Sequence, residues 1–503
     1  MVTAISACAG RVPETPVATT DSVQLAYRQA IALMERKDYE GAERALDSIL
    51  KHPEFGGLSF HEQRYTVHAA GWVRYQRGDF AGALPLLQKL TDTPGADRHT
   101  WIMRMCAAAY TGVAQDAIRS LIVVLERFPE SNKDLPGPLI HNVIWMSGRP
   151  PVTPAERFDL HEALFKANWK SELGIEPDFA WVELAAMWLE RGSPERAREI
   201  LKRVTHAGRL AVKVDSRFDA VVKDMPEATD VKRGLRNGLE SARALVAARP
   251  KALEPLVVLS YEMLNLKQFK EVLALTEPYA GKQAAPSASA PQFEDGRHHI
   301  KWIKSNRAIA LAAVGRYDEA VSLLRGASNS VEGRANISQS IQLGVLLCAL
   351  ARPREALAAV AEIDNPSPYG GMNAEWVRLM AALELEDREG VERSLAYMRE
   401  HRIDAPGTYQ VALVQAGRLD EAAAVLKERL ADPLQRVSAL FDVQSFGWPP
   451  PPSPQLRAWR RASDEFLRRP DVVSAIKKVG RVERFDYVFD AEWDCCRSPS
   501  QAR

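Results

Sequence analysis

The segment from Lys301 to Asn365 contains two successive helix-turn-helix patterns that align with each other. The first runs from Trp302 to Ala327 (WIKSNRAIALAAVGRYDEAVSLLRGA) and the second from Ser340 to Ile363 (SIQLGVLLCALARPREALAAVAEI). In each, apolar and small residues recur at helical spacing on both sides of a break. The alanines of the two second helices, Ala320 and Ala356, are 36 residues apart. Helix pairs repeating at about this interval bury their apolar faces by stacking on one another, so this feature predicts a stack of helix pairs.

The same pattern recurs on both sides of this segment. It begins at Val23, continues through Ala83 and Ala117, which are 34 residues apart, and returns at Ala197 and Ala422. Leu253–Tyr279 is a degenerate unit and Trp376–Met398 is weakly patterned, whereas Tyr409–Leu430 restores the pattern. About nine units therefore account for about two thirds of the chain.

This pattern resembles the tetratricopeptide repeat, which has a small residue where its two helices meet, an aromatic residue at the turn and an alanine in the second helix. Ala308, Tyr317 and Ala320 occupy these places in the clearest unit. The resemblance implies an all-α fold, a right-handed α-solenoid of helix-turn-helix repeats with a helical C-terminal cap. It also implies that the first helices present a concave surface to peptides or partner proteins, and it does not specify which.

Composition is consistent with a folded protein and excludes some partners. Of the 503 residues, 46% are hydrophobic and 26% are charged, which is typical of globular chains. A solenoid grows by stacking neighbours, so this length does not require several separate cores. The formal net charge of +1 gives no overall field that would attract nucleic acid. No apolar run reaches the 18 or more residues that a spanning helix needs.

Breaks in the pattern predict the domain organisation. Ser131–Thr153 is too rich in proline and glycine for a helix, and Thr153 then begins a new helix as an N-cap with Glu156 three residues later. The segment 212–230 is irregular, and a helix returns at 231–248. Residues 446–454 (FGWPPPPSP) are expected to be extended, before a last helical stretch at 455–479. The predicted organisation is a tail or lipoprotein tether at 1–21, a first repeat array at 22–280 with an insert at 131–153, a linker at 281–295, a second array at 296–433, a proline-rich segment and helical cap at 434–490, and a disordered tail at 491–503.

Within the repeat pattern, residues of the first helices are candidates for contact with a ligand. Asn306 lies where the family often has an asparagine that hydrogen-bonds the backbone of a bound peptide, and Lys301 and Lys304 add positive charge for an acidic peptide end. Ordinary solvated helix residues are the alternative reading of this set, and packing between repeats is the alternative for its tryptophans. The candidate peptide-binding residues are Trp302, Asn306, Ile309, Ser338, Gln342, Val345, His68, Trp72 and Tyr75.

The N-terminus has two readings. Residues 5–8 (ISAC) are similar to the lipobox of bacterial lipoproteins, which makes Cys8 a candidate for lipidation and the protein a candidate for the envelope or periplasm. Seven residues before Cys8 do not provide both a basic and an apolar segment of a signal peptide. Either the natural start lies upstream, or Cys8 belongs to a tail in the cytoplasm. A membrane contact is expected only through this anchor.

No motif for catalysis or metal binding is present in the sequence. It contains no phosphate-binding glycine loop, no H-E-x-x-H and no G-x-S-x-G, and the adjacent His298 and His299 lack further ligands at metal spacing. We therefore expect no enzyme activity, no cofactor and no metal, and a protein or peptide as partner. A repeat protein with an enzymatic or small-molecule-binding activity carried by distant residues, and a structural subunit of an envelope assembly, are the alternatives.

Overall fold

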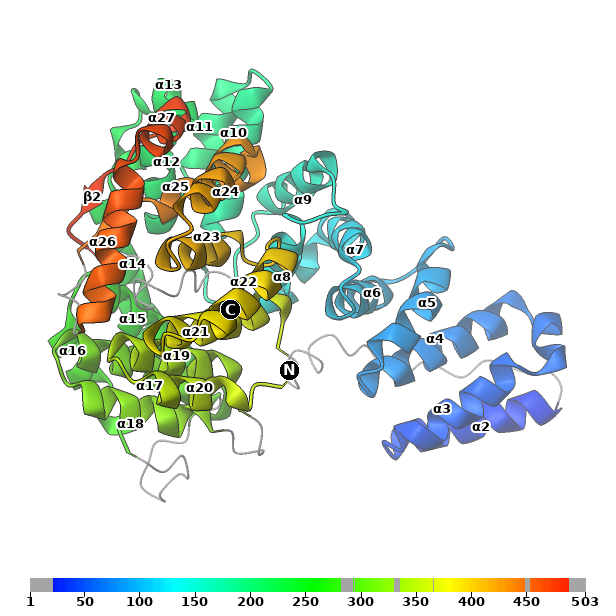
Figure 1. Ribbon diagram of the computed structural model, residues 1–503. Helices are drawn as coiled ribbons and strands as arrows, with labels where there is room; N and C mark the ends of the chain where they lie inside the picture. The colour runs from blue at the N-terminus through cyan, green and yellow to red at the C-terminus, as the bar shows by residue number, and fades with distance from the viewer. Residues whose placement is uncertain are drawn as a thin grey trace. The chain divides into compact units, whose positions relative to one another are not determined.

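The structure, a computed structural model, describes residues 21–281, 293, 295–329, 335–364, 366–447 and 453–487 (Figure 1). In these residues 26 α-helices, α2 to α27, are joined by turns, five 3-10 helices and two strands of two residues each. Helices that follow one another along the chain pack in pairs. The predicted all-α architecture of helix-turn-helix repeats is therefore confirmed.

The chain divides into two compact units, residues 1–180 and residues 181–503. The boundary lies inside α10 (Asp178–Glu190). The helices of the first unit are α2 (Asp21–Glu35), α3 (Tyr39–Leu50), η1 (Pro53–Gly57), α4 (Phe60–Gln76), α5 (Phe80–Thr91), α6 (Arg98–Tyr110), α7 (Ala114–Arg127), η2 (Pro129–Asp134), α8 (Gly137–Met146) and α9 (Pro154–Lys166).

The second unit contains the remaining helices and both strands. In order they are α11 (Pro194–Leu201), α12 (His206–Val214), η3 (Ser216–Phe218), α13 (Asp219–Val222), η4 (Pro226–Thr229), α14 (Val231–Ala248), α15 (Glu254–Asn265), α16 (Phe269–Leu275), η5 (Glu277–Tyr279), α17 (Gly296–Ala313), α18 (Tyr317–Ser328), α19 (Ile337–Ala349), α20 (Pro353–Ala361), α21 (Pro368–Glu384), α22 (Arg388–Glu400), α23 (Pro406–Gln415), α24 (Leu419–Ala431), α25 (Pro433–Asp442), β1 (Ser445–Phe446), α26 (Pro454–Arg468), α27 (Pro470–Val479) and β2 (Arg484–Phe485).

Nine helix pairs share one turn geometry in the described residues. In each, a residue with positive φ lies two residues after the last residue of the first helix and redirects the chain into the second helix. These residues are Lys37, Gly78, Gly112, Gly192, Lys267, Gly315, Ala351, Glu386 and Gly417. The fifth residue after each is small or β-branched, and eight of these nine have no exposed surface: Ala42, Ala83, Ala117, Ala197, Val272, Ala320, Ala356 and Ala422. We call this position the small residue of the repeat.

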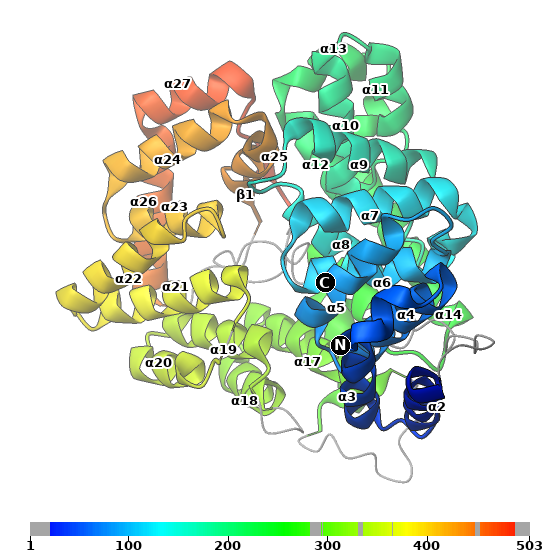
Figure 2. The ribbon, with the colours of Figure 1, turned by 90° about the vertical axis from the view of Figure 1, so that its right-hand side faces the viewer.

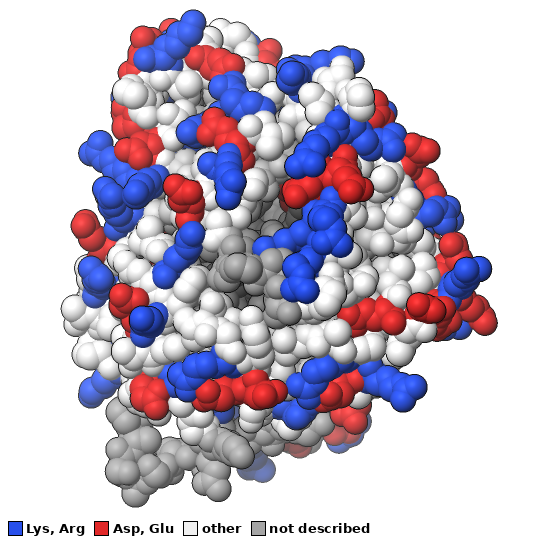
Figure 3. All heavy atoms as spheres, turned by 60° about the vertical axis from the view of Figure 1, so that its left-hand side comes forward, with Lys and Arg blue, Asp and Glu red and all other residues white. Residues whose placement is uncertain are grey.

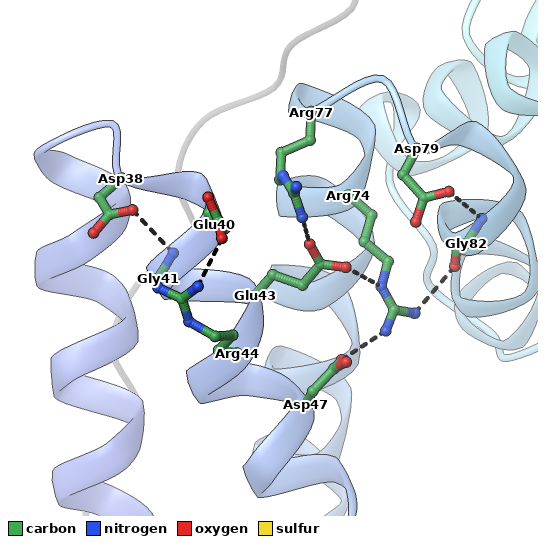
Figure 4. Close-up of polar contacts among 10 residues, drawn as sticks. All are labelled: Asp38, Glu40, Gly41, Glu43, Arg44, Asp47, Arg74, Arg77, Asp79 and Gly82. Carbon is green, nitrogen blue, oxygen red and sulfur yellow. Dashed lines mark hydrogen bonds and ion pairs between the residues drawn. The ribbon is translucent and has the colours of Figure 1, made fainter.

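Two sequence patterns stabilise the start of the second helix. In the first, an aspartate accepts a hydrogen bond from the N–H of a glycine three residues later, as Asp79 does from Gly82 at 2.9 Å (Figure 4). A Cβ atom on Gly82 would lie 2.1 Å from a carboxylate oxygen of Asp79, so another residue there would have to displace this capping side chain. In the second, an arginine pairs with a glutamate three residues later, as Arg316 does with Glu319 at 2.6 Å. In both patterns the next residue is the small residue of the repeat, Ala83 or Ala320.

Charged side chains connect successive repeats of the first unit. Arg74 of α4 donates to Glu43 at 3.1 Å and to Asp47 at 2.6 Å, both on α3 (Figure 4). Its third contact is the carbonyl oxygen of Gly82 on α5, at 3.2 Å. A single guanidinium group therefore joins three helices.

The segment 131–153 contains a helix, so the prediction that it is not helical was wrong. Helix α8 occupies residues 137–146, and η2 covers 129–134. Pro138 lies in the first turn of α8, where its missing N–H has no partner to lose. The proline and glycine residues therefore flank this helix instead of preventing it. The predicted capping box of Thr153 and Glu156 is confirmed at the start of α9.

One further expectation for the second unit needs correction. Residues 212–230, expected to be irregular, contain the end of α12, η3, α13 and η4, whereas the helix expected at 231–248 is present as α14. The helical stretch expected at 455–479 is present as two helices, α26 and α27, because Pro470 begins a new helix. Both pack on the last repeat, α26 against α23 and α27 against α24. They therefore cover the end of the array, as a cap does.

The predicted linker, 281–295, lies inside the second unit and not at its boundary. Residues 282–292 and 294 are outside the described residues. Helices α15 and α17, on either side of it, pack against each other. Asp295 also accepts hydrogen bonds from the N–H groups of Leu253 and Glu254, at 2.7 and 2.9 Å. The stacking of repeats therefore continues across the linker.

The two ends of the array in the second unit meet. Helices α17 to α24 follow one another along an arc (Figures 1 and 2). Near one end of the unit α12 packs against α25, which follows the last repeat. Gly480 forms an isolated antiparallel bridge with Asp215, and β2 pairs in parallel with β1. The second unit is therefore closed upon itself by its C-terminal residues.

Candidate ligand-binding face

The candidate residues of α17 and α19 occupy equivalent positions in two successive repeats. Trp302 and Ser338 both lie 18 residues before the small residue of their repeat, Ala320 or Ala356. By the same count Asn306 matches Gln342 and Ile309 matches Val345. Equivalent positions of stacked repeats lie on one side of the stack. We call this side, in all repeats of the second unit, the first-helix face.

Exposure differs along this face. Trp302 and Ser338 are partly exposed. Asn306 and Gln342 are buried, Ile309 is 3% exposed and Val345 has no exposed surface. In this closed state of the unit, only the first pair of positions offers side chains to a partner. The others lie where helices pack together.

The candidate residues of the first unit are mostly occupied in aromatic packing. The ring of Trp72 meets Tyr39 edge-on, with centroids 5.6 Å apart, and Tyr75 meets Phe80 in the same way at 5.4 Å. Both Trp72 and Tyr75 are buried, so they join repeats and do not offer a free contact surface. His68 is partly exposed. Burial lowers its pKa, nearby Asp97 opposes this shift, and Arg64 and His99 add to it.

Hydrogen bonds between side chains connect the successive first helices. Asn306 Nδ2 donates to Ser260 Oγ on α15, at 2.8 Å, and to the carbonyl oxygen of Val257, at 3.1 Å. Gln339 Nε2 of α19 donates back to Ser305 Oγ at 3.3 Å. The amide group of Asn306, which the resemblance assigned to a bound peptide, therefore already has partners within the protein.

This series continues into α23. Thr408 Oγ1 donates to Asn373 Oδ1 of α21 at 3.4 Å. Trp376 Nε1, one turn further along α21, donates to Gln415 Oε1 at 2.8 Å. Sequence reasoning missed these pairs because a polar residue at a helix–helix contact looks like any solvated residue. The only signal was a polar residue at a position where the helical period expects an apolar one.

Two polar residues of the first helices have no such partner in the described part of the chain. Both oxygens of Glu384 and both amide atoms of Asn265 are buried without a hydrogen bond. The two residues are equivalent, each seven residues before the position of the small residue, and burial raises the pKa of Glu384 to about 7. Lys304 is 5% exposed, and burial lowers its pKa. Burial of Asn265 and Glu384 without a hydrogen bond costs free energy, and a partner that supplied the missing hydrogen bonds would recover it.

The described residues of the first helices offer side chains for packing and for hydrogen bonding. No group of three or more metal-binding side chains occurs among them. The two thiols described, Cys106 and Cys348, are both buried. No described helix is long and apolar enough to cross a membrane. Acidic and basic side chains are interspersed over the face shown in Figure 3. Cys8, the candidate for lipidation, is outside the described residues, so its role stays a prediction.

These features define a class of protein, an α-solenoid built from stacked helical hairpins. The family model described as tetratricopeptide repeat matches residues 302–325, which is the hairpin of α17 and α18. The chain therefore contains a tetratricopeptide repeat, and the resemblance noted in the sequence is confirmed. No curated protein matches the sequence.

Solved structures of repeat proteins cover most of the chain at low similarity. The anaphase-promoting complex hetero-tetramer Cut9-Hcn1 covers 91% of this chain and 96% of its own, with 13% identity and a TM-score of 0.28. Yeast Tom70 covers 91% and 99%, with 10% identity and a TM-score of 0.25. The Naa15/Naa10 complex bound to HypK-THB covers 91% and 76%, with 14% identity and a TM-score of 0.24. At these scores the whole chains do not superpose, so no function follows from the likeness.

Proposed function

We propose that this protein is a scaffold that binds a peptide segment or a partner protein on the first-helix face of its second unit. The observation that supports this most directly is the placement of Trp302 and Ser338. They stand at equivalent positions of adjacent repeats, one of which matches the family model, and both are partly exposed. Lys301, beside Trp302, contacts Asn336 of the next repeat at 3.3 Å. A partly exposed tryptophan next to polar groups is typical of the anchors at protein interfaces.

The proposal assigns different roles to the candidate residues. Trp302 and Ser338 contact the partner directly. Asn306 and Gln342 hold neighbouring first helices in position. Ile309 and Val345 are buried and stabilise the face by packing. Tyr75 and Trp72 stabilise the first unit, and His68 is its only partly exposed candidate. The proposal involves no catalytic step.

Photo-cross-linking tests this proposal. A photoreactive amino acid replaces Ser338 in one variant and Arg354 in the other. Arg354 is exposed on α20, the second helix of the same hairpin, and serves as the matched control. We expect a stoichiometric protein adduct from position 338 and not from 354, and its loss on Trp302→Ala. Equal capture at both positions, or capture at 338 that survives Trp302→Ala with unchanged circular dichroism, would exclude this face.

A further inference from the structure

The residue just before the positive-φ turn residue differs between the earlier and the later repeats. It is the last position before the chain turns from the first helix into the second, so in stacked repeats it lies on the edge formed by these turns. In the four earlier repeats this residue is polar: Arg36, Arg77, Thr111 and Arg191. In the five later repeats, all in the second unit, it is apolar: Leu266, Val314, Leu350, Leu385 and Ala416. The turn edge of the second unit therefore carries a line of apolar side chains.

Three neighbouring members of this line offer exposed apolar surface. Val314 is 38% exposed, Leu385 is 40% exposed, and Leu350 between them is partly exposed. Their helices α17, α19 and α21 pack side by side (Figures 1 and 2), so these residues lie one helix-to-helix distance, about 10 Å, apart. Single exposed apolar residues are common, but a continuous apolar strip is typical of an interaction surface. We call Val314, Leu350 and Leu385 the apolar row.

The residues beside the apolar row give it an acidic end. Those on either side of Val314 and Leu350 are small and neutral: Ala313, Gly315, Ala349 and Ala351. Leu385, in contrast, lies between Glu384 and Glu386. The arginines that follow the first two turns each pair with a glutamate at 2.6 Å: Arg316 with Glu319 and Arg352 with Glu355. The row is therefore apolar and uncharged over two repeats and negatively charged at the third.

The carboxylate of Glu384 is available to a cation from outside the protein. Glu384 is the last residue of α21 and is partly exposed. Both of its oxygens are turned inward, where no group of the described residues donates a hydrogen bond to them. Rotation of the side chain toward a cation beside Leu385 therefore breaks no hydrogen bond. An unsatisfied carboxylate of this kind requires an explanation, and a partner that supplies the donor provides one.

We propose that the apolar row is the docking site for a basic amphipathic α-helix of a partner protein, with a lysine or arginine of that helix bound to Glu384. Side chains seven residues apart on one face of an α-helix are about 10.5 Å apart, which matches the spacing of the row. The helix therefore carries apolar residues at intervals of seven and its basic residue beside Leu385. A second copy of the row does not fit this description, because the row contains no basic residue. The row is a different surface from the first-helix face, so this inference goes beyond the proposed function.

A displayed library of random peptides tests this inference on the full-length protein. The peptides are about 21 residues long, which gives three intervals of seven, and binders of the parent protein are selected and synthesised. Their Kd values are measured by fluorescence polarisation. We expect peptides with apolar residues every seven positions and a lysine or arginine near one end. Their binding should be about tenfold weaker to Leu385→Ser and to Glu384→Gln, both with unchanged circular dichroism.

Ile403→Ser is the matched control for loss of an exposed apolar side chain. Ile403 is 61% exposed and lies between α22 and α23, at the opposite edge of the repeats from the turns that carry the row. The selected peptides should bind this variant as tightly as the parent protein. Equal losses of affinity in Ile403→Ser and Leu385→Ser, or no peptide whose binding depends on Leu385 and Glu384, overturn the inference.

A matched pair of peptides isolates the contact with Glu384. One selected peptide is made with arginine and again with neutral citrulline at its basic position. Citrulline should weaken binding to the parent protein about tenfold and binding to Glu384→Gln hardly at all, because both changes remove the same contact. An equal effect of citrulline on both proteins, or selected peptides that are acidic, contradicts the assigned role of Glu384.

Two outcomes would assign the binding to another surface or occupant. If every selected peptide loses affinity with Trp302→Ala and none with Leu385→Ser, the first-helix face binds them, so the proposed function stands and the apolar row is not a docking site. Sedimentation velocity tests for a second copy of the chain. A dimer of the parent protein that Leu385→Ser dissociates would show that another copy covers the row, which overturns the partner helix.

Discussion

Glu384 should destabilise the folded protein at neutral and alkaline pH, and Glu384→Gln should remove this cost. Both carboxylate oxygens are buried without a hydrogen-bond donor, and burial raises the pKa from 4.5 to about 7. A shift of this size corresponds to an upper limit of about 3 kcal/mol at about 1.36 kcal/mol per pKa unit. Residual exposure of the side chain screens the charge, so we expect about 1–2 kcal/mol.

The sign of the pH dependence follows from proton linkage. Below pH 4.5 the carboxyl group is protonated in both the folded and the unfolded chain, so the glutamate and glutamine proteins should be equally stable. Between pH 4.5 and about 7 the unfolded chain loses the proton while the folded chain keeps it, so this group lowers the free energy of unfolding as pH rises. Above pH 7 the full cost is present. Glu384→Gln should therefore gain stability at pH 8 and show no gain at pH 4.

Urea unfolding followed by circular dichroism at pH 4, 6 and 8 measures this difference. Glu400→Gln is the matched control, because Glu400 is exposed at the end of the neighbouring helix α22. We expect no pH-dependent gain in that variant. A destabilised Glu384→Gln protein at pH 8, or an equal gain at pH 4 and pH 8, would refute the view that Glu384 is a desolvated carboxylate without a partner.

Three changes in the first unit test the contacts that define its repeats, each by urea unfolding. Gly82→Ala forces a methyl group to within 2.1 Å of Asp79 and breaks the helix cap, for an expected loss of about 1 kcal/mol. Arg104→Met leaves the buried carboxylate of Asp116 without the guanidinium group that donates to it at 3.1 Å, for an expected loss of about 3–5 kcal/mol. Arg74→Ala removes the group that joins three helices, for an expected loss of about 1–2 kcal/mol.

Two matched controls calibrate these values. Gly57→Ala adds a methyl group where no atom lies within 4 Å. Arg44→Ala removes an arginine whose side chain is 70% exposed and pairs with Glu40. If Gly82→Ala and Arg74→Ala lowered the free energy of unfolding no more than the controls do, the Asp79 cap and the contacts of Arg74 would contribute nothing specific to stability. Arg104→Met as stable as the parent would mean that the buried carboxylate is satisfied by other groups.

The turn residues and the small residue of each repeat were readable in the sequence because they are local. A helix that ends at Gly315 and resumes before Ala320 requires a left-handed residue and a small side chain within one short stretch. The capping box at Thr153 was readable for the same reason. Such features depend on residues a few positions apart, so repeated spacing alone predicted the helix pairs and the family.

How those helix pairs pack together was decided by the tertiary structure alone. Proline and glycine around residues 131–153 predict a break, but packing against α6 and α7 stabilises α8 between them. The partner of Asn306 is Ser260, 46 residues away, and that of Arg481 is Asp219, 262 residues away. Contacts over such separations leave no periodic trace in a single sequence. The sequence therefore determined the repeat, because its features are local, whereas the closure of the second unit depends on contacts between its two ends, which lie far apart in the sequence.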